Sequence, residues 1–166
     1  MNSTRICFRS FVLLALCAGL LLVVPSCAKT PSPQDALRNF VNALVNKQWE
    51  SVWNGMSFSS QKDYEEKVFK PFKANFAATP EDKKQIKHPQ LGVSVQDILE
   101  MSPKEFFMLN MEKTTVRNDV LAVLNPESLK VEKVTVEGDM ARIKLEGNNP
   151  VVTMKKENGE WRVCLF

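Results

Sequence analysis

The sequence predicts an α+β domain in which helices come first and an antiparallel sheet comes last. Apolar residues recur with a period of about 3.6 residues through the first part of the chain, and from Lys130 the period changes to about 2. Two tight-turn strings, residues 137–140 and 157–160, each separate two alternating segments. Together, these observations predict helices packed on an antiparallel sheet that ends in a four-stranded meander.

The N-terminus has the three parts of an export signal. Arg5 and Arg9 give it positive charge, the fourteen residues 11–24 form an unbroken apolar run, and the small residue Ser26 precedes Cys27. A bilayer-spanning helix needs about 18–20 apolar residues. The run is therefore predicted to be the apolar core of a cleaved signal peptide.

Residues 24–27, Val-Pro-Ser-Cys, resemble the bacterial lipoprotein box, in which an aliphatic and a small residue precede the acceptor cysteine. Pro25 departs from the residues commonest at its place. The resemblance implies cleavage before Cys27, which would carry a diacylglycerol thioether and an amide-linked acyl chain such as palmitate. Two or more acyl chains anchor a protein stably on a bilayer. An ordinary secretory signal and an uncleaved anchor are the alternatives.

This processing divides the chain into a signal peptide at 1–26, a lipidated tether at 27–33 and a single α+β domain at 34–166. Loss of two arginines lowers the 22 Lys and Arg residues to 20, against 19 Asp and Glu, for a net charge of +1. A nearly neutral surface gives no electrostatic reason to expect nucleic acid as a partner.

Cys164 is the one ordinary thiol that the predicted mature chain keeps. Cys7 and Cys17 lie in the signal, and Cys27 is the predicted acylation site. An intramolecular disulfide is therefore not expected. An inert thiol is the simpler expectation for Cys164, with an intermolecular disulfide as the alternative.

Two helices have clear start signals. Ser32 as the cap, Pro33 at the first helical position and Asp35 at the third predict the first helix. Residues 102–105, Ser-Pro-Lys-Glu, repeat this signature and predict another. The apolar residues that follow at helical spacing are Ala36, Leu37, Phe40, Val41, Leu44 and Val45 in the first helix, and Phe106, Phe107, Leu109 and Met111 in the other.

The segment between these helices is less regular. Apolar residues at helical spacing predict a helix that ends near Gly55 and another that begins at about Ser60. Pro71 should kink or split the second one, because proline lacks a backbone N–H. Residues 79–90 are polar and rich in lysine, which predicts a connection or a solvated helix.

The register of the meander follows from pairing outward from the two turns. The pairs expected on the apolar face are Val136–Ala141, Val134–Ile143, Met154–Val163 and Val152–Leu165. Those expected on the polar face are Thr135–Arg142, Lys133–Lys144, Lys155–Arg162 and Thr153–Cys164. Residues 147–150 should join the hairpins. The preceding helices must cover the apolar face.

The capped first helix, residues 47–53 (Lys-Gln-Trp-Glu-Ser-Val-Trp) and residues 159–163 (Gly-Glu-Trp-Arg-Val) resemble the nuclear-transport-factor-2-like superfamily, and more narrowly its small bacterial lipoproteins. The resemblance covers residues 34–56 and 130–166. It implies a strongly curved sheet around a conical cavity. It implies no activity, because such cones host enzymes, binding modules and scaffolds.

Three tryptophans, Trp49, Trp53 and Trp161, are candidates for lining such a cavity. Packing in the hydrophobic core is the alternative, because aromatic residues on a helix stripe and a sheet face usually pack together.

Residues that could carry chemistry are few. His88, the one histidine, is expected in a solvated loop, and Tyr64 on the core or flank of a helix. Asp97, Asp119 and Asp139 are expected to act in helix capping and turns. No Cys, His and carboxylate cluster has metal-ligand spacing, and the glycines form no phosphate loop. We therefore expect no metal and no cofactor.

These features favour a non-catalytic lipoprotein of the bacterial envelope, held on the lipid bilayer through acylated Cys27. Its domain would bind a small apolar ligand or a neighbouring envelope protein. The competing hypothesis is a cofactor-free isomerase-like or dehydratase-like enzyme, which requires a carboxylate buried in the cavity. Ala28 after the cysteine favours the periplasmic side of the outer membrane in a Gram-negative cell, by resemblance to enterobacterial sorting.

We predict that the mature chain begins at Cys27 and carries its lipid there. Mass spectrometry of the protein extracted from membranes should show an N-terminal peptide with a diacylglyceryl group. Cys27→Ser should abolish this modification and release or mislocalise the protein, whereas Cys17→Ser, a matched change inside the signal, should leave both unaltered. An unmodified Cys27 in the processed wild-type chain would contradict the prediction.

Overall fold

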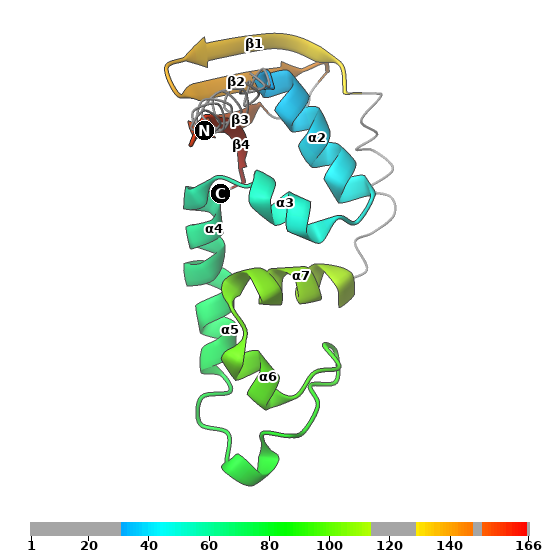
Figure 1. The fold of residues 1–166 in the computed structure, drawn as a ribbon, viewed down its shortest axis with the longest axis vertical. Helices are drawn as coiled ribbons and strands as arrows, with labels where there is room; N and C mark the ends of the chain where they lie inside the picture. Colours follow the sequence, from blue (N-terminus) through cyan, green and yellow to red (C-terminus); the bar gives the residue numbers. More distant parts are fainter. Residues whose placement is uncertain (1–30, 114–128, 148–150, 166) are drawn as a thin grey trace, which may run out of the picture.

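A computed structural model describes residues 31–113, 129–147 and 151–165. The predicted signal peptide, Cys27 and Asp119 lie outside these residues. The chain has an α+β fold, with helices first and a four-stranded antiparallel sheet of order β1-β2-β3-β4 last, as the sequence predicts (Figure 1). The sheet lies at one end of the long axis, and α6 and η2 lie at the other.

The element bounds are as follows. The helices are α2 (Pro33–Val45), α3 (Trp49–Gly55), α4 (Phe58–Tyr64), the π-helix η1 (Glu65–Phe69), α5 (Lys70–Ala74), the 3-10 turn η2 (Glu81–Lys83), α6 (Val95–Glu100) and α7 (Pro103–Lys113). The strands are β1 (Val131–Glu137), β2 (Met140–Leu145), β3 (Val152–Glu157) and β4 (Glu160–Cys164).

The predicted hairpin registers are confirmed with one exception. The observed pairs include Val136–Ala141, Val134–Ile143, Thr135–Arg142, Lys133–Lys144, Met154–Val163, Lys155–Arg162 and Thr153–Cys164. Asn158 and Gly159 both have positive φ, as a two-residue Asn-Gly turn requires. The pairing of Val152 with Leu165 is wrong, because Leu165 lies beyond β4 and donates its N–H to Ser60 Oγ at 2.9 Å.

Both predicted helix starts are confirmed. At α2, Ser32 Oγ accepts a hydrogen bond from the N–H of Asp35 at 3.2 Å. At α7, the Ser102 N–H donates to Glu105 Oε2 at 2.8 Å, and the Glu105 N–H donates back to Ser102 Oγ at 3.3 Å. These reciprocal bonds satisfy N–H groups that have no partner inside the helix.

The helix expected from Ser60 begins earlier and contains a π-helix. Ser57 caps α4 by accepting a hydrogen bond from the N–H of Ser60, so the helix begins at Phe58. Ahead of Pro71, the N–H of Lys70 bonds to the carbonyl of Glu65, five residues back. The wider turn accommodates the missing proline N–H, and the helical path continues into α5.

The capping role expected of Asp97 is confirmed, and Asp139 lies in a turn as expected. Asp97 forms a capping box with Ser94 at the start of α6, and the hydrogen bond from Ser94 lowers the pKa of its carboxyl. Asp139 lies in the β1–β2 turn, where its carbonyl accepts the Lys156 N–H at 2.7 Å.

The core lies between the inward face of the sheet and the helices α2 and α3 (Figure 1). On the sheet side, the four inward residues at the centre of the core are no more than 3% exposed; they are Ala141, Ile143, Met154 and Val163. On the helix side they meet Leu37, Phe40, Val41, Val52 and Met56. Each fully buried Ile or Met side chain contributes about 1.5–3 kcal/mol.

The helices α2 and α3 are in close contact at Gly55. A Cβ atom added there would lie 2.8 Å from Cδ2 of the buried Phe40 ring. Real Cβ atoms do not approach a carbon this closely, so the ring would have to move. Glycine is therefore required at the end of α3 for the two helices to pack.

We predict that Gly55→Ala destabilises the fold by about 1–3 kcal/mol, because an added methyl group overpacks the α2–α3 contact. Urea unfolding should show the loss. Ser51→Ala, an exposed position one turn earlier in α3, is the matched control and should change stability little. Equal stability of the Gly55 variant and wild type would contradict the close contact with Phe40.

Candidate functional site

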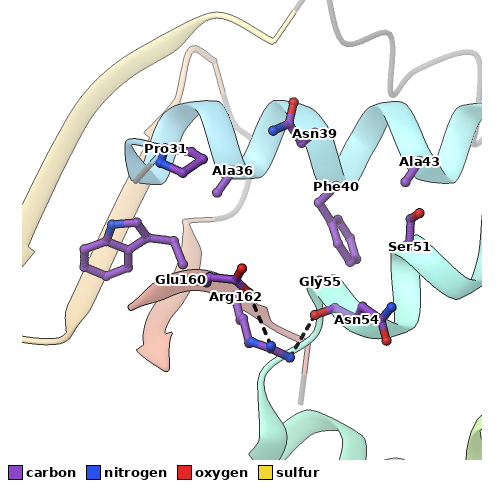
Figure 2. Close-up of a pocket in the computed structure, with 11 residues that line it drawn as sticks. Pro31, Ala36, Asn39, Phe40, Ala43, Ser51, Asn54, Gly55, Glu160 and Arg162 are labelled. Carbon is purple, nitrogen blue, oxygen red and sulfur yellow. Dashed lines mark hydrogen bonds and ion pairs between the residues drawn. The ribbon is translucent and has the colours of Figure 1, made fainter. Parts of the chain in front are cut away.

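A groove of about 220 Å³ lies where α2, α3 and β4 meet (Figure 2). Small side chains on the two helices leave the space open. Residues lining the groove are Pro31, Ala36, Asn39, Phe40, Ala43, Ser51, Asn54, Gly55, Glu160, Trp161 and Arg162.

Arg162 closes one side of the groove and is held from three directions. Its guanidinium donates to the Asn54 carbonyl at 2.9 Å and contacts Glu160 at 3.4 Å (Figure 2). It also stacks over the ring of Phe58, 4.5 Å from the centroid. The side chain is only 14% exposed. Because these contacts fix it in place, Arg162 joins α3, α4 and β4 rather than reaching into solvent.

Arg162 also carries a polar atom without a partner. Among the described residues, its Nε atom is buried and forms no hydrogen bond. A buried, unpaired donor is costly. This atom is the one unsatisfied polar group in the lining of the groove that the described residues reveal.

The three candidate tryptophans do not line one cavity. Trp49 is buried and donates its indole N–H to Glu112 at 2.9 Å. Trp53 is buried against Tyr64 and Phe107, with ring centroids 5.8 and 5.3 Å away. Trp161 is half-buried and alone of the three lines the groove. Trp49 and Trp53 therefore contribute mainly to core packing.

The centre of the inward face of the sheet is filled rather than hollow. The side chains of Ile143 and Met154 at its centre are fully buried, and α2 and α3 pack directly on them. The conical cavity that the superfamily resemblance implies is thus occupied by the protein's own side chains in this part of the structure.

His88 is not the solvated loop histidine that the sequence predicts. It is half-buried, and its ring lies edge-on to Phe72 and Phe76, with centroids 5.8 and 5.6 Å away. Its Nδ1 accepts the N–H of Leu91 at 3.3 Å. Phe72 in α5 and Phe76 just after it contact the His88 ring, which the polar local sequence of the loop does not indicate.

A second, more open pocket of about 450 Å³ surrounds His88. Its lining includes the apolar side chains of Phe72, Leu91 and Phe106. It also includes Lys67 of the π-helix. Beyond these, the pocket is lined by Val68, Pro71, Asn75, Gln90 and Asn110.

One carboxylate is buried among the described residues, that of Glu157, which is 8% exposed. It accepts the N–H of Phe58, at the start of α4, at 2.8 Å and pairs with Lys155 at 3.3 Å. Both contacts occupy the carboxylate in holding α4 to the β3–β4 hairpin. The sequence does not predict the burial of Glu157, because acidic residues in turn sequences are commonly exposed to solvent.

The other perturbed groups are arranged for structure. Hydrogen bonds from Ser102 and Lys104 lower the pKa of the exposed carboxyls of Glu105 and Glu50, so these groups stay charged. Burial raises the pKa of Tyr64, with a hydrogen bond to Asn110 acting in the opposite direction. An acid catalyst near neutral pH needs a raised carboxyl pKa, which neither Glu105 nor Glu50 has.

Within the described ranges, no three His, Cys, Asp or Glu side chains gather as a metal site would require. No helix in that part of the chain is long and apolar enough to cross a membrane. Cys164 is a half-buried free thiol opposite Thr153 in β4.

Comparison with known proteins gives no relative. No protein-family model, curated protein or solved structure matches the chain.

We predict that Glu157→Ala destabilises the protein by about 1–3 kcal/mol, because it leaves the Phe58 N–H without its acceptor at a half-buried helix start. Glu157→Gln should recover part of the loss, since its amide oxygen can still accept that bond. Glu160→Ala, across the same turn but exposed, is the control and should have little effect. Denaturant unfolding measures all three, and equal stabilities would contradict the role of Glu157.

Proposed function

We propose that the chain is a lipoprotein of the bacterial envelope, anchored through acylated Cys27, whose non-catalytic α+β domain binds another envelope protein. The anchor is supported by the signal segment and the lipoprotein box. The partner-binding role is supported by one structural observation above all: side chains fill the inward face of the sheet. A filled face leaves binding to the outer surface, where proteins rather than small apolar molecules are recognised.

We also propose that the domain is a compact variant of the nuclear-transport-factor-2-like architecture. Support comes from the order of its elements, with a capped helix and a second short helix first and a meander last. The packing of α2 and α3 on one face of that meander agrees with the same assignment. In this variant the helices occupy the space that a ligand takes in hollow members.

The enzyme hypothesis has less support. It requires a carboxylate buried in a cavity, and the buried carboxylate of Glu157 is committed to the N–H of Phe58 and to Lys155. Exposed carboxyls with lowered pKa values are poor general acids.

Native mass spectrometry of the protein purified in mild detergent tests the proposed role. We predict a mass equal to the acylated chain alone, because a filled core has no room for a co-purifying apolar molecule. Extraction of non-covalent lipid followed by refolding should leave the mass of the acylated chain unaltered. The acyl chains on Cys27 are covalent and stay, whereas a ligand bound by the domain would be removed. A stoichiometric small molecule held by the domain would contradict the partner-binding role and favour ligand binding.

A further inference from the structure

The proposed anchor fixes one end of the domain close to the bilayer. Pro31 lies four residue steps after Cys27 and lines the groove together with Glu160 and Trp161. Each residue step spans at most about 3.6 Å, so the tether can hold Pro31 no more than about 14 Å from the acylated cysteine. The groove therefore lies close to the membrane surface if Cys27 carries lipid.

Both hairpin turns lie at this same end of the sheet. The Lys156 N–H bonds to the carbonyl of Asp139 in the β1–β2 turn, and Lys156 pairs with Trp161 next to the β3–β4 turn. Val136 precedes the first turn and is 52% exposed. We call Pro31, Val136, Lys156 and Trp161 the turn-end surface.

The side chains of Val136, Lys156 and Trp161 lie on the inward face of the sheet, next to its hairpin turns. Val136 pairs with Ala141, which pairs with Met154, and Lys156 and Trp161 follow on that same face. The Nζ atom of Lys156 lies over the Trp161 ring, 5.9 Å from its centroid. The result is an exposed apolar side chain, a half-buried indole and a long cationic side chain at the tethered end.

We infer that the turn-end surface lies against the bilayer at the level of the lipid headgroups, with the Trp161 indole in contact with lipid. This inference rests on the proposed anchor at Cys27. Tryptophan favours the membrane–water interface because its ring is apolar and its N–H is polar. Lysine can lay its apolar stem along the same boundary while its charge stays in water.

Charge does not hold this surface on the membrane. Glu137, Asp139, Glu157 and Glu160 lie at or near the turns, and Arg142, Lys155, Lys156 and Arg162 lie beside them in the hairpin strands. With the signs balanced, anionic lipid brings no net attraction, so the tether and the apolar contact carry the docking. Contact with a zwitterionic bilayer should therefore be insensitive to salt.

The helices α6 and η2 lie at the other end of the long axis from the sheet (Figure 1). Asp82, in η2, is therefore far from the turn-end surface.

Site-specific fluorescence in vesicles tests this orientation. The full chain is expressed with its signal in a Cys164→Ser background, and one new cysteine is added as Glu160→Cys or, as the matched distal control, Asp82→Cys. Both positions are exposed. Each protein is labelled with an environment-sensitive dye and reconstituted in phosphatidylcholine vesicles, with and without a lipid that carries a nitroxide on its headgroup.

We expect the label at position 160 to shift to shorter wavelength and to be quenched by the nitroxide lipid, at low and at high salt alike. The label at position 82 should show neither effect. Trp161→Ala should weaken the quenching at position 160. Labels that respond equally, or a response at position 82 alone, would overturn the orientation.

The mass of the N-terminal peptide from the same samples distinguishes a failure of the proposed anchor at Cys27 from a failure of the proposed orientation. Acylated Cys27 with equal responses overturns only the orientation. An unmodified Cys27 overturns the proposed anchor and the orientation with it.

Discussion

The sheet persists in water because α2 and α3 cover its apolar face. Ile143 and Met154 lie at the centre of that face and are fully buried, and an uncovered four-stranded meander would expose both. The segment that follows α3 is bound to the edge strand β4. Met56 forms a β-bridge with Val163, and the Ser57 N–H bonds to the Val163 carbonyl at 2.9 Å. Gly55 permits the close helix contact that this arrangement needs.

The groove is a consequence of where this cover ends. The groove lies where α2 and the end of α3 meet β4, and small residues such as Ala36 and Ser51 leave a gap there. Arg162 fills part of it and is held by Asn54 and Glu160. The same packing that buries the centre of the inward face thus leaves an open groove beside Pro31.

The sequence predicts the features that local rules control. Hairpin registers follow from turn chemistry and alternation, and helix starts follow from Ser caps with a proline or an acid at fixed offsets. The pairing of Met154 with Val163 and the cap at Ser32 were predictable for this reason. These rules use only neighbours in the chain, and tertiary packing overturns them at the end of β4, where the Leu165 N–H bonds to Ser60 Oγ instead of extending the strand.

Tertiary packing controls what the sequence did not reveal. His88 turns inward because Phe72 and Phe76 from another element meet it, and Glu157 is buried because α4 begins beside it. Neither contact has a signal in the neighbouring residues. The separation of Trp161 from Trp49 and Trp53 likewise depends on how far α2 and α3 extend over the sheet.

Native-state hydrogen exchange tests most directly whether the helix cover and the sheet form one cooperative unit. If they do, the slowest amides of α2, β2 and β3 will exchange with the same free energy, equal to that of global unfolding. Exchange of α2 at a clearly lower free energy than β2 and β3 would contradict this, because the sheet would then survive without its cover.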